Sequence, residues 1–171
     1  MIPFPEPPLH GEGFVLRAWT GEHREAYRTA MRDSESRRWL NDYDETAAEI
    51  EDQRVAGEAL VLTIADAESD AFLGFVALLM KEHRVGELAY MVAPEARGRG
   101  LARGAAQLVT DWALATLELP RMQLRIDPEN AASIRVAERC GYRFEGVLRS
   151  VFELRGQRVD SAMYSRLPTD I

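Results

Sequence analysis

The sequence predicts a single domain of the α/β class, built on one mixed sheet that is mostly antiparallel and flanked by helices. The chain has 171 residues, of which 46% are hydrophobic, and this is enough to bury the core of one globular domain. Its segments favour a strand, helices, three strands joined by hairpin turns, a helix, a strand, a helix and a final hairpin. A doubly wound sheet would instead alternate strands and helices. We therefore expect one domain over residues 1–171, with 1–12 as a loosely ordered extension that contains several prolines.

The first part of the chain predicts one strand followed by helices. The apolar run 14–19 favours the strand. Thr20 is a candidate N-cap for a helix over residues 21–32, and a shorter helix is expected over 34–40. The segment 46–58 begins with Thr-Ala-Ala-Glu, which is a capping box, and it predicts a third helix.

Three strands are expected next, joined by two turns. The segments 60–65 and 72–80 are both apolar, and the polar residues 66–71 between them favour an antiparallel hairpin. A second turn over 82–86 leads into a strand over 87–92. This part of the chain therefore predicts consecutive strands that pair as an antiparallel meander.

A long helix is expected after the segment 94–102, and Pro120 ends it. Its side chains recur at helical spacing over about five turns, which predicts a stripe that faces the core. This stripe comprises Leu101, Ala105, Leu108, Trp112 and Thr116. The residues 122–126 then alternate apolar with polar side chains and predict a half-buried strand.

The last part of the chain predicts a helix and a hairpin. Residues 127–130 carry helix start signals, and a helix of about ten residues is expected to follow. Gly141 stands where a C-cap glycine belongs. The inner face of this helix comprises Ile134, Ala137 and Cys140. Residues 142–167 predict strands separated by a turn over 155–157.

The segment 94–102 is the first candidate functional site. It connects a buried strand to a helix, so that backbone N–H groups and the positive end of the helix dipole point toward one place. Gly98 and Gly100 remove the Cβ atoms that would hold a ligand away from the backbone. Nearby cations come from Arg97, Arg99 and Arg103. The segment therefore predicts an anion site suited to a diphosphate.

Other interpretations of this glycine-rich turn are weaker. It is not a Walker A loop, because no Gly-Lys-Ser/Thr follows the glycines. The spacing of Gly98, Gly100 and Gly104 resembles a dinucleotide fingerprint only loosely, and it follows an antiparallel meander where such a fingerprint requires a βαβ unit. A turn with a purely structural role stays open as an alternative.

Amino-acid composition limits which binding partners and which cellular compartment we expect. A net charge of -7 argues against nucleic acid as a main partner. The same charge would suit a cationic substrate, although acidic solubility explains it as well. The single cysteine fits a reducing, cytoplasmic compartment. No signal peptide and no membrane span are expected, because no segment has the required apolar length.

Several catalytic chemistries lack the residues that they require. The three histidines, His10, His23 and His83, are scattered without metal-ligand spacing, so no metal is expected. The chain has no G-x-S-x-G elbow for a serine hydrolase. Cys140 belongs to the inner face of a predicted helix, which favours packing over a nucleophilic role.

Three motifs resemble those of the GNAT N-acetyltransferases. Arg97-x-x-Gly100-x-Ala102 matches their diphosphate signature Q/R-x-x-G-x-G/A. The segment 130–142 is similar to their second block, N-x-x-S-x-x-V-x-x-x-x-G-F/Y. The Phe-Glu-Gly sequence at 144–146 extends the match, as in the RimJ/RimL-like branch that acetylates protein N-termini. The motifs occur in the family's order and spacing. With the order of the elements, the resemblance extends over nearly the whole chain, from Leu16 and Arg17 to Asp160 and Tyr164.

This resemblance implies acetyl-CoA as the co-substrate and places its binding residues. In the family, the strand before the glycine loop separates from its neighbour, and Met91, Val92 and Ala93 would pair with the pantetheine arm. The diphosphate would lie against Arg97, Gly98, Arg99, Gly100, Leu101 and Ala102. Asn130 would bind the pantetheine region, and Ser133 would lie near the thiol. The alternative for Asn130 is a helix N-cap, with Ser133 as a polar residue of the first turn.

Acetyl transfer to an amine requires a proton acceptor, because an amine of pKa ~8 to ~10.4 is protonated before it attacks. Glu87 is the candidate base, since it begins the strand that leads to the cofactor loop. Its alternative role is a solvent-exposed or ion-paired glutamate. A free N–H near Val92 would polarise the thioester oxygen.

The leaving thiolate needs only modest help, since a model thiol has a pKa of ~8.5. Many GNAT enzymes place a tyrosine four residues before the Gly-Phe/Tyr pair, and here this position is Ala137. The resemblance therefore leaves Ser133, or water, as the proton donor.

Together these observations predict a cytoplasmic, acetyl-CoA-dependent N-acetyltransferase that acts by direct attack in a ternary complex. Its acceptor would be a primary amine, either a protein N-terminus or a small molecule, and a homodimer is common in the family. A non-catalytic acyl-CoA-binding module stays open as the alternative. A cationic amine would be attracted by Asp42, Asp44, Glu45 and Asp160, although surface solvation explains these acids equally well.

Overall fold

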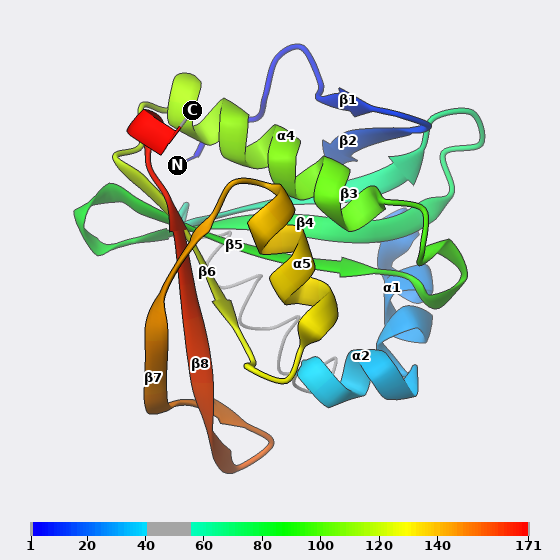
Figure 1. Ribbon diagram of the computed structural model, residues 1–171. Helices are drawn as coiled ribbons and strands as arrows, with labels where there is room; N and C mark the ends of the chain where they lie inside the picture. The colour runs from blue at the N-terminus through cyan, green and yellow to red at the C-terminus, as the bar shows by residue number, and fades with distance from the viewer. Residues whose placement is uncertain (1, 41–55, 171) are drawn as a thin grey trace.

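The computed structural model describes residues 2–40 and 56–170, whose strands form one mixed sheet (Figure 1). The described strands follow the order β1-β2-β3-β4-β5-β6-β8-β7. They are β1 (His10–Gly11), β2 (Phe14–Ala18), β3 (Ala59–Asp66), β4 (Phe72–Lys81), β5 (Val85–Val92), β6 (Arg121–Ile126), β7 (Arg143–Leu154) and β8 (Gln157–Arg166). The α/β class with a mostly antiparallel sheet is therefore confirmed.

The helices lie close to their predicted positions. They are α1 (Arg24–Met31), α2 (Ser34–Trp39), α4 (Leu101–Ala115) and α5 (Ala131–Arg139), with single 3₁₀ turns at Gly21–His23, Glu82–Arg84, Pro94–Ala96 and Pro168–Asp170. The helix predicted over 46–58 lies mostly outside the described residues, and residues 56–57 form a turn. In the part of the chain that the structure describes, no helix has the length and apolarity to cross a membrane.

The sheet opens between its two parallel strands. β5 and β6 pair only from Val85↔Arg121 to Glu87↔Gln123, and beyond this point they have no further pairs. β6 continues instead against β8, while β5 continues against β4. Figure 1 shows the two strands diverging, with α5 next to the opening and α4 beside it. The separation that the family resemblance implied is therefore present in this chain.

The core lies between the central strands and α4. Leu62, Ile64 and Val76 on the strands are at most 1% exposed. The predicted stripe of α4 is only partly right, since Leu108 and Trp112 are half-buried and Thr116 is exposed after the helix ends. The buried face instead comprises Leu101, Ala105, Ala106, Val109, Thr110, Ala113 and Leu114. Small side chains on this face let the helix lie close to the sheet, so the larger ones turn to its edge.

The N-terminal segment is more firmly attached than the sequence suggests. Ile2 is buried among the core residues, with 8% of its surface exposed. The Leu16 N–H donates to the Leu9 carbonyl at 2.8 Å, and β1 pairs with β2. The expectation of a loosely ordered extension rested on its prolines, which restrict the backbone but do not prevent an apolar residue from packing.

Candidate active site

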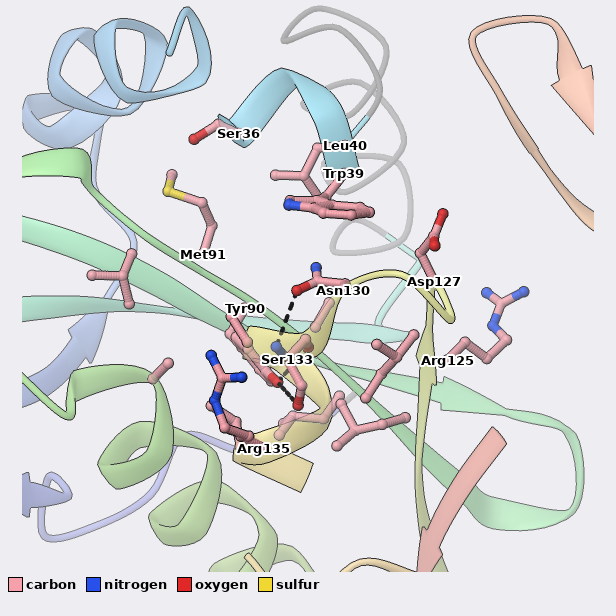
Figure 2. Close-up of a pocket in the computed structure, with 18 of the residues that line it drawn as sticks. Ser36, Trp39, Leu40, Tyr90, Met91, Arg125, Asp127, Asn130, Ser133 and Arg135 are labelled. Atoms are coloured by element: carbon pink, nitrogen blue, oxygen red, sulfur yellow. Dashed lines mark hydrogen bonds between the residues drawn. The ribbon is translucent and has the colours of Figure 1, made fainter. Parts of the chain in front are cut away.

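A cavity of about 700 Å³ occupies the opening between β5 and β6. β5 and the residues 96–98 and 100–103 line one part of it, and α5 lines another. α2 and the β7–β8 hairpin close the remaining sides. Figure 2 shows the close-up, with Trp39 and Leu40 of α2 above the first turn of α5. Segments far apart in the chain therefore meet at the point where the sheet separates.

The pairing register decides which backbone groups of β5 face this cavity. The Ala93 N–H donates to the Leu73 carbonyl at 2.8 Å, which places Ala93 in a hydrogen-bonded pair with β4. Such pairs alternate along antiparallel strands, so the peptide groups of Met91 also face β4. A Cβ atom on Gly74 would collide with the Met91 carbonyl oxygen, which agrees with this direction. The groups that face the opening are consequently those of Leu88, Tyr90 and Val92.

This register changes the roles of the three predicted pantetheine residues. Val92 keeps its expected place, with a free peptide edge at the cavity. Met91 lines the cavity with its side chain, which Figure 2 shows, but its peptide groups belong to β4. Ala93 is fully buried and does not line the cavity. The peptide groups of Tyr90 therefore face the cavity, where those of Met91 and Ala93 were expected.

The glycine-rich segment has the geometry of an anion cradle. Gly98 and Gly100 have φ values of +79° and +78°, a left-handed conformation that favours glycine. Cβ atoms added at either glycine would meet no other atom within 4 Å, so the space beside them is open. α4 begins at Leu101, and the N–H groups of its first turn have no intrahelical partner. The backbone of 98–102 therefore leaves open space for an anion, and its diphosphate role stays a prediction.

The side chains of Arg97 and Arg99 already have partners within the protein. Arg97 donates from Nη2 to Asp33 Oδ2 at 2.7 Å and to Ser36 Oγ at 2.9 Å, so it joins the loop to the start of α2. Arg99 Nη2 lies 3.7 Å from Asp66 Oδ2, and Arg99 does not line the cavity. Hydrogen bonds from the Ser36 backbone and from Arg97 lower the pKa of the Asp33 carboxyl below its ordinary value. These two arginines therefore hold the glycine-rich segment against the start of α2 and the end of β3.

Other cations line the cavity beside the cradle. Arg103, Arg135 and Arg139 are among its lining residues, and none of them forms an ion pair with a described residue. Arg135 is labelled in Figure 2, next to the first turns of α5. Sequence reasoning did not select Arg135 and Arg139, although both lie in the 130–142 motif and are spaced one helical turn apart. Their free charges are available to phosphate groups at this end.

Asn130, Ser133 and Tyr90 form one hydrogen-bonded group (Figure 2). Asn130 Oδ1 accepts the Ser133 N–H at 3.0 Å and caps α5, which is the alternative role that the sequence had left open. Ser133 Oγ lies 2.7 Å from the Tyr90 hydroxyl. Burial raises the pKa of Tyr90 to about 12. Sequence reasoning missed Tyr90, because a tyrosine inside an apolar strand resembles ordinary core.

Glu87 is buried, with only 5% of its surface exposed, and it is ion-paired. Its Oε2 accepts from Arg125 Nε at 2.9 Å and from Gln123 at 2.8 Å, while Oε1 accepts from Arg125 Nη2 at 2.7 Å. Lys81 Nζ lies 3.6 Å from Oε1. The carboxylate lines the cavity, and these three hydrogen bonds already use most of its acceptor sites.

The opposite end of the cavity combines apolar and acidic side chains. Trp39 and Phe152 contribute aromatic surface. Carboxylates come from Asp127 and Asp160, of which Asp160 accepts the Ser150 N–H at 2.8 Å. Glu35 also lines the cavity, next to Ser36 on α2. The acids expected at 42, 44 and 45 lie outside the described residues. Within residues 2–40 and 56–170, no cluster of three His, Cys, Asp or Glu side chains could hold a metal ion.

Comparisons with known proteins point in the same direction as this geometry. A family model described as an acetyltransferase (GNAT) domain matches residues 14–143, which is more than half of the chain. The chain is 29% identical over 120 residues to an uncharacterized N-acetyltransferase of Bacillus licheniformis, covering 69% of this chain and 67% of that protein. It is also 36% identical over 75 residues to spermidine N(1)-acetyltransferase of Escherichia coli (strain K12), covering 44% of this chain and 40% of that enzyme. The second match therefore spans less than half of the enzyme's length.

Two solved structures share the fold over nearly the whole chain. Spermidine N-acetyltransferase from Vibrio cholerae, in complex with CoA and spermine, superimposes with a TM-score of 0.78 at 22% identity, covering 94% of this chain and 98% of that one. Mycobacterium smegmatis RimJ, in complex with CoA-disulfide, gives a TM-score of 0.80 at 20% identity, covering 96% and 87%. At these identities the likeness shows the fold alone.

Proposed function

The chain belongs to the GNAT acetyltransferase family, and on this premise we propose that it transfers the acetyl group of acetyl-CoA to a primary amine by direct attack in a ternary complex. One observation carries the proposal: the free edge of β5 leads directly into the open glycine cradle at the N-terminus of α4. A strand edge offers peptide groups to the amides of a pantetheine arm, and a helix N-terminus suits a diphosphate. The two features lie in one cavity.

The residues present fit acetyl-CoA. Peptide groups of Leu88, Tyr90 and Val92 would bind the pantetheine arm, and the backbone of 98–102 would bind the diphosphate. Arg103, Arg135 and Arg139 would neutralise its phosphates, since they have no ion-pair partner among the described residues. When bound, acetyl-CoA supplies an activated acetyl thioester. Four of the predicted residues would act indirectly, by holding β5 and the glycine-rich segment in place. They are Met91, Ala93, Arg97 and Arg99.

The reaction requires residues that stabilise the oxyanion, stabilise the leaving sulfur and accept the amine proton. The Val92 N–H would stabilise the oxyanion, because it is unpaired at the free edge of β5. The Ser133 hydroxyl would donate a hydrogen bond to the leaving sulfur. Glu87 stays the candidate acceptor for the amine proton, through Oε1, which accepts only the Arg125 Nη2 hydrogen bond.

The acceptor class follows from the charge at the far end of the cavity. Asp127 and Asp160 line this end together with aromatic side chains. We propose a small amine with a second positive charge or a protein N-terminus as the acceptor. The carboxylates would hold the charge that does not react, at a distance from the acetyl group.

Release of the CoA thiol tests the proposal directly. Acetyl-CoA is incubated with the protein and with a panel of amines that includes spermidine, monoamines and short peptides with free N-termini. We expect thiol release that depends on the amine and is fastest with cationic acceptors. Tight binding of CoA without release for any amine would support the non-catalytic acyl-CoA module instead.

A further inference from the structure

The Tyr90 hydroxyl lies 2.7 Å from Ser133 Oγ, at the point where the free edge of β5 meets the first turn of α5. Both residues line the cavity, and both are only partly buried as whole residues. The Ser133 N–H is already bound to Asn130 Oδ1, which fixes the backbone that carries the hydroxyl. The orientations of the two hydroxyl protons are therefore what remains to be decided in this group.

Tyrosine and serine hydroxyls can each donate or accept, so one bond between them has two possible directions. Burial raises the pKa of Tyr90 to about 12, and its hydroxyl consequently keeps its proton throughout the neutral range. The nearest other acceptor for this proton is the Ser133 carbonyl, at a longer 3.4 Å. A donated bond from Tyr90 to Ser133 Oγ is thus the shorter and better satisfied arrangement.

We propose that Tyr90 is a positioning residue, whose hydroxyl donates to Ser133 Oγ and thereby leaves the Ser133 proton directed at the leaving sulfur. The proposal rests on the acetyl transfer proposed above. When the carbon–sulfur bond breaks, the electron pair stays on sulfur, and Ser133 stabilises the thiolate by a hydrogen bond without giving up its proton. A model thiol has a pKa of ~8.5, so the thiolate leaves without a full proton transfer. The proton lost by the amine goes to the base or to water.

A second buried tyrosine in the same region shows what a purely structural bond looks like. The Tyr142 hydroxyl lies 2.7 Å from Thr110 Oγ1, the same distance as in the Tyr90–Ser133 pair. Burial raises the pKa of Tyr142 as well. Neither Tyr142 nor Thr110 lines the cavity. Substitution of Tyr142 therefore provides a control for the loss of one buried tyrosine hydroxyl.

The test compares Tyr90→Phe, Ser133→Ala, the double variant Tyr90→Phe/Ser133→Ala and the control Tyr142→Phe. Each substitution by Phe keeps the ring and removes only the hydroxyl. We expect Tyr90→Phe to lower kcat by roughly 5- to 10-fold, the effect of one hydrogen bond, with little change in the KM for acetyl-CoA. Ser133→Ala should lower kcat further, and the double variant should match Ser133→Ala alone. Tyr142→Phe should leave kcat unchanged.

Each contrary result has a distinct meaning. An equal fold-loss from Tyr90→Phe in the parent and in the Ser133→Ala background would show that Tyr90 acts independently, and it would overturn the proposal. A parent-like kcat for Tyr90→Phe would overturn it too, as would an equal loss in Tyr142→Phe. Failure of the proposed function itself is recognised separately, because the parent protein would then show no amine-dependent thiol release.

Discussion

Glu87 and Arg125 form a bidentate ion pair across the last paired residues of β5 and β6. Arg125 donates from Nε to Oε2 at 2.9 Å and from Nη2 to Oε1 at 2.7 Å. The guanidinium also lies 5.5 Å from the ring of Phe152, on the β7–β8 hairpin. The pair stands where the two strands separate, so it joins the sheet junction to the hairpin that closes the cavity.

Glu87→Gln should lower kcat by roughly 100-fold if Glu87 accepts the amine proton, because general-base catalysis contributes at least this factor. Affinity for CoA should be unchanged, since Glu87 lies away from the glycine cradle. Steady-state kinetics and CoA titration measure the two quantities. The matched variant Arg125→Gln keeps the carboxylate and frees one oxygen, so it should lose less activity. Parent-like kcat in Glu87→Gln would place the base elsewhere and leave only the ion-pair role.

Gly100→Glu should abolish CoA binding. The new side chain would enter the open space of the cradle, and its carboxylate would repel a diphosphate. Calorimetric titration with CoA measures the loss. Gly156→Glu is the control, because Gly156 has a similar φ of +73°, equally open surroundings and a position in the β7–β8 turn. Both variants should lose about 1–2 kcal/mol of stability from left-handed strain, and only Gly100→Glu should lose CoA. Unchanged CoA affinity in that variant would contradict the diphosphate site.

Asp33→Ala should lower the free energy of unfolding by about 1 kcal/mol, because the Asp33 side chain caps α2 by accepting the Ser36 N–H at 3.0 Å. Arg97→Ala should weaken the same helix, since Arg97 binds Asp33 and Ser36. Chemical denaturation of the two single variants and the double variant forms a cycle in which the losses should not add. Acetyl-CoA should keep a similar KM in both single variants. A rise in this KM for Arg97→Ala alone would show that the arginine serves the diphosphate.

Acid should destabilise the protein through Glu145. Hydrogen bonds from Arg121 and Ser165 lower the pKa of the Glu145 carboxyl from 4.5 to about 2 in the folded protein. A group with a lowered folded pKa stabilises the protein above its unfolded pKa and loses this contribution as pH falls through the folded value. The stability difference between the parent and Glu145→Gln should thus be constant above pH 4.5 and shrink between 4.5 and 2. Urea unfolding at several pH values measures it.

The control for this titration is Glu153→Gln, which removes the same charge from the same strand. Glu153 is exposed and forms no ion pair with a described residue, so this variant reports the effect of net charge alone. A pH-independent difference for Glu145→Gln, after this correction, would contradict the role of the Arg121–Glu145 pair.

Local signals account for the parts of the fold that were predicted correctly. The alternation in 122–126 gave β6, with Met122, Leu124 and Ile126 buried, because strand periodicity is a property of neighbouring residues. The N-cap of α5 and the glycine after its C-terminus could also be predicted, because both depend on neighbouring residues. The stripe of α4 was misjudged at Leu108 and Trp112, since the face that a helix buries depends on the sheet beneath it.

In the candidate site, too, features set by neighbouring residues could be predicted and those set by distant residues could not. The glycine cradle could be predicted, because left-handed backbone at Gly98 and Gly100 and a helix N-terminus are encoded in a few consecutive residues. The peptide groups that face the cavity could not, because they follow from the pairing of Ala93 with Leu73 on another strand. The hydrogen bond of Tyr90 to Ser133 could not be predicted either, because it joins β5 to α5.

The sequence by itself therefore determined the class of the fold, the anion cradle and the family to which the chain belongs. These depend on periodicity, capping and short motifs, whose physical causes act between near neighbours. The tertiary structure alone decided the partners of the charged and hydroxyl side chains. Glu87 with Arg125, Arg97 with Asp33 and Tyr90 with Ser133 are joined across 38, 64 and 43 residues. Such pairs depend on strand register and helix placement, which become fixed only when the whole sheet is assembled.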